Sequence, residues 1–76
     1  MILQKVIKTL ADVLNIDEDT ISSQDSLEDD LGVDDLSKYE IVLAIEEEFD
    51  IEIEPDAADN METVQDLVEV IKSAEE

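Results

Sequence analysis

Apolar side chains near the N-terminus recur three and four residues apart, the spacing that places them on one face of a helix. The residues in this pattern are Ile2, Leu3, Val6, Ile7, Leu10, Val13 and Leu14. Asn15 ends the periodicity and is expected to cap the helix. The pattern indicates a helix that packs one face on a core.

Residues 16–34 show neither a helical nor a strand period, which predicts a loop that is long for so small a chain. We expect short turns near Asp17–Thr20 and Ser26–Asp30. Gly32 is the only glycine, so positive φ is expected there, just before the next helix. The scattered apolar residues are expected to pin the loop to the core: Ile16, Ile21, Leu27, Leu31 and Val33.

A second helix is predicted from about Asp35 to Phe49. Asp34 and Asp35 place carboxylates where the first helical N–H groups lack partners and where the helix dipole favours negative charge. Its apolar residues exceed one narrow stripe: Leu36, Tyr39, Val42, Leu43 and Phe49 share much of one side, and Ile41 and Ile45 widen it. This helix is therefore either buried on two sides or leaves an apolar patch for a partner.

The C-terminal third is predicted to hold a connector, a short helix and a last long helix. Ile51–Ile53 alternates like a strand but is too short for a sheet, and residues 56–61 suffice for one helical turn after Pro55. Thr63 offers an N-cap, with Asp66 three residues later as in a capping box. The last helix carries the apolar residues Val64, Leu67, Val68, Ile71 and Ala74, with Lys72 near its C-terminal end.

These elements predict an all-α fold, a small four-helix bundle with one short helix, in one domain spanning residues 1–76. With 24 acidic and 4 basic residues the formal charge is −20, which disfavours nucleic acid and anionic membranes as partners and favours basic protein surfaces. The absence of histidine and cysteine makes catalysis by this chain alone improbable. No apolar window is long enough to span a membrane and no signal peptide is recognisable, so we expect a cytoplasmic protein. We also expect it to be a monomer.

The sequence resembles the acyl carrier protein family over essentially its whole length. The resemblance is carried by Asp30-Leu31-Gly32-Val33-Asp34-Asp35-Leu36, by Glu46-Glu47-Glu48-Phe49-Asp50-Ile51-Glu52-Ile53, and by Thr63-Val64-Gln65-Asp66. In that family the loop reads Asp-Leu-Gly-x-Asp-Ser-Leu, and its serine carries a 4′-phosphopantetheine arm whose thiol holds acyl groups. The resemblance implies a non-catalytic carrier in fatty acid, polyketide or related lipid synthesis.

Asp35 occupies the position that matches the family's serine. A carboxylate attacking the β-phosphate of coenzyme A would give a hydrolysis-prone mixed anhydride in place of a stable phosphodiester. We therefore expect no arm at Asp35 and a permanent apo form. Ser37 is a less favoured alternative, because two helical residues rotate a side chain by about 200°. A carrier-like interaction module that never holds an acyl group remains an alternative.

The resemblance also implies a docking surface and an acyl cleft. Members of the family dock on basic patches of synthases, acyltransferases and phosphopantetheinyl transferases through acidic and apolar positions. The matching residues here are Asp34, Tyr39, Glu40, Leu43, Glu46, Glu47 and Met61. Positions matching the cleft between the second and third helices are Leu43, Phe49, Ile53, Met61 and Leu67. Plain core packing explains the cleft residues equally well.

Clustered carboxylates suggest weak binding of calcium or magnesium, both of which prefer oxygen ligands. The candidates are Asp29, Asp30, Asp34 and Asp35 around the start of the second helix, and Glu46, Glu47 and Asp50 near its end. The spacing differs from that of an EF-hand. We expect binding of this kind to stabilise the fold by offsetting the repulsion among the acidic residues.

Overall fold

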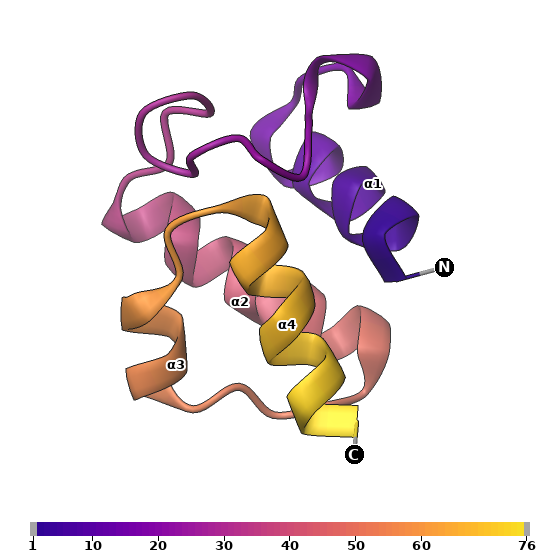
Figure 1. Ribbon diagram of the computed structural model, residues 1–76, viewed down its shortest axis with the longest axis vertical. Coiled ribbons are helices and arrows are strands. Elements are labelled where there is room, and N and C mark those ends of the chain that lie inside the picture. Colours follow the sequence, from indigo (N-terminus) through magenta and orange to yellow (C-terminus); the bar gives the residue numbers. More distant parts are fainter. Residues whose placement is uncertain (1, 76) are drawn as a thin grey trace.

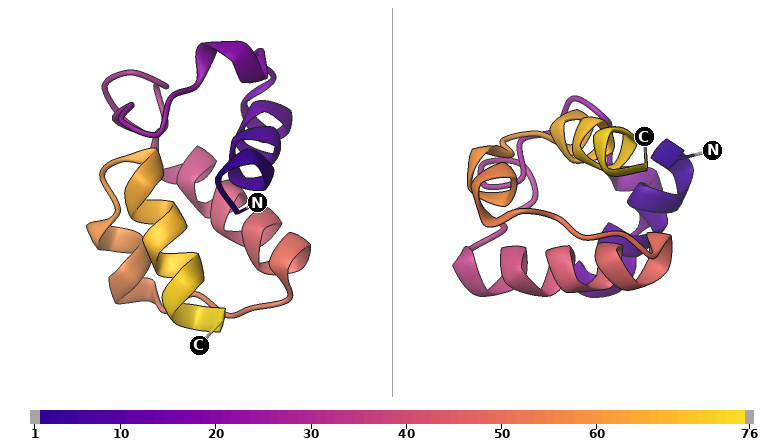
Figure 2. Two further views of the ribbon diagram at one scale, coloured as in Figure 1. Left: turned by 45° about the vertical axis from the view of Figure 1, so that its right-hand side comes forward. Right: turned by 90° about the horizontal axis from the view of Figure 1, so that it is seen from below.

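The computed structural model describes residues 2–75, and within that range the regular structure is helical. The elements are α1 (Ile2–Leu14), the short 3₁₀ turn η1 (Glu18–Thr20), α2 (Asp35–Phe49), α3 (Pro55–Asn60) and α4 (Val64–Glu75). α1, α2 and α4 pack around the core, and the short α3 lies beside α4 (Figures 1 and 2). The prediction of an all-α fold with four helices, one of them short, is confirmed.

Each long helix contributes side chains to a single core. α4 contributes the most, and its apolar stripe is buried from Val64 to Ile71, whereas Ala74 at its end is exposed. Burying one leucine or isoleucine contributes about 1.5–3 kcal/mol, so these contacts are the main source of stability. The completely or almost completely buried large side chains are Val6, Leu10, Leu27, Ile41, Ile45, Val64, Leu67 and Ile71.

The long loop between α1 and α2 is fastened to the start of α4 by main-chain hydrogen bonds. The amide of Leu27 donates to the carbonyl of Glu62 at 2.8 Å, and that of Gln65 donates to the carbonyl of Ser23 at 2.9 Å. Leu27 is buried, as are Ile21 and Val33. The packed loop is therefore confirmed, including the turn at η1. Ile16 is the exception, because its side chain is 38% exposed and does not pin the loop.

The helix ends confirm most of the local predictions. Asn15 and Gly32 both have positive φ, of 58° and 69°. Thr63 and Asp66 form the predicted capping box, since the Asp66 amide donates to Thr63 Oγ1 and the Thr63 amide donates to Asp66 Oδ2, both at 3.1 Å. Asp50, which ends α2 with a φ of 55°, was not predicted.

The orientation of α2 decides between the alternatives left open for this helix. Its buried residues are Ile41 and Ile45, which face the core. Leu36, Tyr39 and Leu43 are 69%, 62% and 46% exposed, so the side that holds them faces outward. The helix thus leaves an apolar patch uncovered and is not buried on two sides.

Candidate functional site

The start of α2 is fixed by a turn and a side-chain cap. Gly32 supplies the positive φ of the turn. Asp34 caps the helix with Oδ1, which accepts a hydrogen bond of 2.8 Å from the amide of Ser37. This bond, together with a weaker one from the Ser37 side chain, lowers the pKa of Asp34 below the ordinary aspartate value. The cap fixes the start of α2 at Asp35.

Asp35 is the first residue of α2, and its side chain is exposed. It lies at a groove of about 550 Å³ between α2 and α3, which we call the α2–α3 groove. The residues that line it are Asp35, Lys38, Tyr39, Val42, Leu43, Glu46, Ile53, Pro55, Ala58 and Asp59. The walls are mainly apolar, so a group held at Asp35 would have an apolar channel beside it.

Lys38 joins the two sides of the α2–α3 groove. Its Nζ lies 3.5 Å from the carbonyl oxygens of Asp59 and Met61, at the C-terminal end of α3. Carbonyl groups at a helix C-terminus carry partial negative charge and attract a cation. This contact holds α3 against α2 next to Asp35.

An exposed apolar stripe runs along α2, and two of its residues, Tyr39 and Leu43, also line the α2–α3 groove. We call Leu36, Tyr39 and Leu43 the outer stripe, because they stand three or four residues apart and share one side of the helix. Glu40 and Glu47 are exposed beside them. Apolar side chains set among carboxylates suit a partner surface that is itself apolar and basic. The docking surface predicted from the sequence includes Tyr39 and Leu43 but omits Leu36. Leu36 lies three residues before Tyr39 and seven before Leu43, a spacing that places all three on one side of a helix.

Comparison with known proteins agrees with this geometry. The protein family described as "Phosphopantetheine attachment site" matches residues 4–71. The acyl carrier protein of Caulobacter vibrioides is 46% identical over 70 residues, which are 92% of this chain and 90% of that protein. The acyl carrier protein of Sinorhizobium fredii is 45% identical over 74 residues, covering 97% and 95% of the two chains.

The chain belongs to the acyl carrier protein family.

Solved structures of acyl carrier proteins support the same conclusion. The structure from Enterococcus faecalis is 38% identical with a TM-score of 0.77, and the match covers 96% of this chain and 92% of that one. A Mycobacterium tuberculosis chain proposed to be an acyl carrier protein is 30% identical with a TM-score of 0.90, covering 96% and 97%. Acyl carrier proteins are phosphopantetheine carriers without catalytic activity, and this chain is a non-catalytic member of that family. Within residues 2–75 no helix is both long and apolar enough to cross a membrane.

The structure gives Glu46 and Met61 roles that differ from those expected for a docking surface. The carboxylate of Glu46 accepts a hydrogen bond of 2.8 Å from the amide of Ile53 and so ties the segment after α2 back onto the helix. Met61 is only 4% exposed and belongs to the core. Both placements come from tertiary contacts that no local pattern reveals, and a part for Glu46 or Met61 in docking stays a prediction. Asp34, Tyr39, Glu40, Leu43 and Glu47 remain at the surface.

The residues expected to line the acyl cleft are divided between the groove and other regions. Leu43 and Ile53 line the α2–α3 groove. Met61 and Leu67 are core residues, with Leu67 fully buried. Phe49 lies at the far end of α2, where Lys5 Nζ stands 5.0 Å from the centre of its ring. Two of the five residues predicted for the acyl cleft, Leu43 and Ile53, thus line this groove, and the acyl cleft itself stays a prediction.

The carboxylate clusters do not form a preorganised metal site. Among residues 2–75 no group of three or more Asp or Glu side chains is placed to hold a metal ion. Asp34 and Glu46 already accept hydrogen bonds from main-chain amides. Weak cation binding by the candidates at the two ends of α2 stays a prediction.

Ser37 is poorly placed to take the role of Asp35. Its side chain is half-buried, and its amide is engaged by the Asp34 cap. Ser37 also does not line the α2–α3 groove, whereas Asp35 does. The two positions therefore differ in exposure and in their access to the groove.

Proposed function

We propose that this chain is an acyl carrier scaffold of fatty acid or related lipid synthesis that stays in the apo form because Asp35 stands at the attachment position. The observation that carries the proposal is the placement of Asp35, exposed at the first turn of α2 and at the mouth of the α2–α3 groove. A group attached there could reach the groove. A carboxylate offers no stable linkage to a phosphate, whereas a hydroxyl does.

The partner surface supports the same proposal. The outer stripe and the carboxylates of Asp34, Glu40 and Glu47 are exposed along α2 and its N-cap. We propose that this surface meets basic patches on synthases, acyltransferases and a phosphopantetheinyl transferase. Because such steering is electrostatic, complex formation should weaken as salt is raised. We further propose that residues 1–76 act as a single carrier domain.

The test is the intact mass of the protein after incubation with coenzyme A, magnesium and a promiscuous phosphopantetheinyl transferase. We expect the protein to remain unmodified and Asp35→Ser to gain one phosphopantetheine. Ser37→Ala, alone and combined with Asp35→Ser, is the matched control. Modification of the unaltered protein that disappears in Ser37→Ala would contradict the proposal and identify Ser37 as the site.

A second candidate is an interaction module that never carries an acyl group. The exposed outer stripe favours it equally well, because docking does not require the arm. Modification of the Asp35→Ser variant distinguishes the two candidate functions. If that variant is folded by circular dichroism and still escapes modification, more than one residue has departed from the carrier pattern, and the interaction module is the better account.

A further inference from the structure

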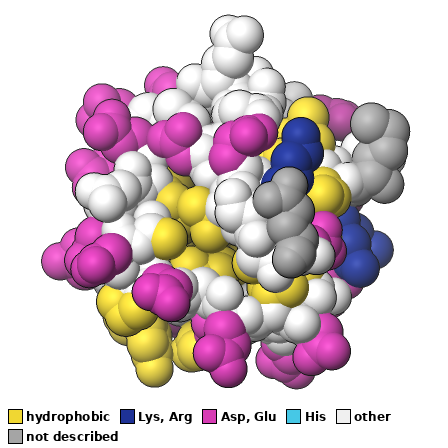
Figure 3. All heavy atoms as spheres, turned by 60° about the horizontal axis from the view of Figure 1, so that its bottom comes forward, with side chains coloured by type: hydrophobic (Ala, Val, Ile, Leu, Met, Phe, Trp, Pro, Cys, Tyr) yellow, Lys and Arg dark blue, Asp and Glu magenta, His cyan; other side chains and the backbone are white. Residues whose placement is uncertain are grey.

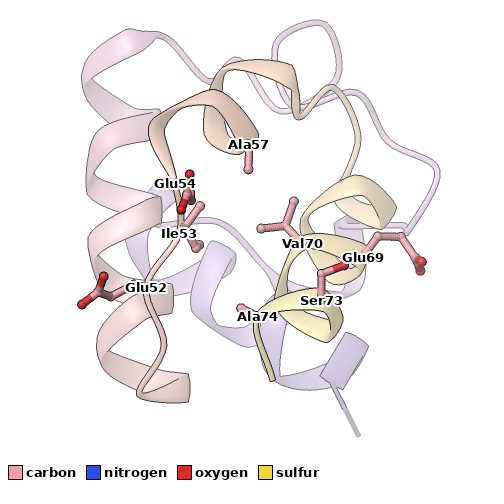
Figure 4. A pocket seen from close by; sticks show the side chains of 8 residues that line it. All are labelled: Glu52, Ile53, Glu54, Ala57, Glu69, Val70, Ser73 and Ala74. Atoms are coloured by element: carbon pink, nitrogen blue, oxygen red, sulfur yellow. The ribbon is translucent and has the colours of Figure 1, made fainter. Parts of the chain in front are cut away.

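A second groove lies on the other side of the segment that joins α2 to α3. We call residues 51–54 the connector and this hollow of about 470 Å³ the connector groove. Figure 4 shows Ile53 of the connector, Ala57 of α3 and Val70 of α4 directed toward the same space. The connector groove shares only Ile53 with the α2–α3 groove, so the two open on different sides of the connector. Its lining is Glu52, Ile53, Glu54, Ala57, Glu69, Val70, Ser73 and Ala74.

The rim of the connector groove is acidic and its floor is apolar. Glu52, Glu54 and Glu69 are exposed around the groove, the side chains of Glu52 and Glu69 point away from its centre (Figure 4), and none of the lining residues is basic. Glu69 already has partners in Gln65, at 2.8 Å, and Lys72, at 3.8 Å. On this side of the molecule hydrophobic atoms gather in a hollow, with acidic side chains above, to the left and below them and lysine side chains to the right (Figure 3). A complementary ligand therefore carries positive charge on either side of an apolar group.

The main chain of the connector offers hydrogen-bonding groups beside this groove. The Ile53 amide is used by Glu46. Among residues 2–75, no hydrogen bond involves the amides of Glu52 and Glu54 or the carbonyl of Glu52. An extended peptide that binds alongside another chain forms hydrogen bonds with main-chain groups of this kind, and its alternate side chains enter adjacent pockets.

We propose that the connector groove binds a short extended segment of a partner protein in which an apolar residue stands between two basic residues. The apolar side chain lies over Ile53, Ala57 and Val70, and the basic side chains meet Glu52 and Glu54. Main-chain groups of the segment pair with the connector. This surface is separate from the outer stripe of α2, and the proposal does not depend on what happens at Asp35.

The first experiment maps binding by amide chemical shifts of the ¹⁵N-labelled protein. The probe is a short peptide of alternating lysine and valine, and the control is the matched peptide of lysine and serine. We expect saturable shifts at the connector and along the groove side of α4 with the valine peptide, and weaker binding of the serine peptide. Shifts confined to the outer stripe, or equal for both peptides over the whole acidic surface, would overturn the proposal.

The second experiment separates this groove from the general charge of the chain. Glu52→Gln combined with Glu54→Gln should raise the Kd for the valine peptide about fivefold, whereas Glu28→Gln combined with Asp29→Asn, which removes the same charge elsewhere, should raise it less than about twofold. Equal effects of the two double variants would reduce the interaction to non-specific attraction and overturn the proposal.

A groove-filling variant tests the apolar part without changing the charge. Ala74 is exposed at the edge of the connector groove, so Ala74→Gln should leave the helix folded while it narrows the groove. We expect the Kd for the valine peptide to rise and circular dichroism to stay unchanged. Binding of a long-chain amine, with no binding of the peptide, would show instead that the groove takes a small cationic amphiphile.

Discussion

α4 and α2 use their apolar residues in opposite ways. Four of the six apolar residues of α4 are at most 3% exposed, namely Val64, Leu67, Val68 and Ile71. α2 buries Ile41 and Ile45 but leaves the outer stripe, Leu36, Tyr39 and Leu43, between 46% and 69% exposed. α4 thus contributes mainly to stability, while a large part of the apolar surface of α2 is available to partners. In this small fold the two tasks are assigned to different helices.

The largest expected effect comes from truncating one leucine in each helix. Leu67→Ala should lower the free energy of unfolding by about 2–5 kcal/mol, because it leaves a cavity in the core. Leu36→Ala should change it by about 0.5 kcal/mol or less, because this side chain is 69% exposed. The measurement is urea unfolding at fixed salt. A comparable loss in both variants would show that the outer stripe supports the fold.

If Leu67→Ala proves too unstable to measure, Ile71→Val gives a milder test. Ile71 is fully buried in α4, so we expect a loss of about 0.5–1.5 kcal/mol.

The N-terminal cap of α4 should contribute less to the free energy of unfolding than the core residues of this helix do. Thr63→Ala removes the hydroxyl that accepts from the Asp66 amide and should cost about 1 kcal/mol in unfolding free energy. Thr9→Ala is the matched control, because Thr9 lies inside α1 and its hydroxyl only donates to the carbonyl of Lys5. Alanine is favoured in a helix interior, so this control should be neutral or slightly stabilising. Equal losses in the two variants would argue against the cap.

The caps also predict a local pH dependence. Hydrogen bonds from the Glu62 and Thr63 amides lower the pKa of Asp66 below the ordinary aspartate value of about 4. The stabilising contribution of this carboxylate is therefore complete above that value and is lost as pH falls through the lowered pKa of the folded state. The stability difference between the protein and Asp66→Asn should shrink from neutral pH to about pH 2. Asp34→Asn gives the same test at α2, and a difference that stays constant with pH would refute the capping role.

The smallest effect concerns divalent cations near α2. Millimolar calcium should raise the melting temperature by about 4 °C or less beyond sodium chloride at equal ionic strength. Asp29→Asn with Asp35→Asn should reduce this rise, whereas Glu69→Gln with Glu75→Gln, in α4, should not. If calcium and sodium chloride act alike, the acidic residues contribute only general repulsion.

The same two helices show what sequence alone can and cannot give. α4 was predictable in its start, its cap and most of its buried face, because one periodic stripe and one capping box determine them. Ala74, the last residue of the predicted stripe, is exposed. The extent of α2 was equally clear from its periodicity. Its orientation was not, because apolar residues lie around most of the helix, and only the packing of the folded molecule selects Ile41 and Ile45 for the core.

Some features of the candidate site could likewise be predicted from the sequence, and others could not. The positive φ of Gly32 and the capping by Asp34 follow from local sequence, and both are present in the structure. The role of Glu46 depends on the connector folding back to bring Ile53 within 2.8 Å, which is a non-local event. The burial of Met61 depends on the same kind of tertiary contact. Local chemistry could be predicted, and the contacts between distant segments could not.

The short α3 has a consequence for the dynamics of the molecule. It has six residues and no buried side chain, and isolated helices shorter than about 12–15 residues are marginal in water. Lys38 is one of its few attachments to α2. We expect α3 to open before the rest of the fold, so its amides should exchange with deuterated solvent fastest among the helices, and faster still in Lys38→Met. Since α3 forms a wall of both grooves, a single opening would widen both, and a ligand that holds one groove closed would change the affinity of the other.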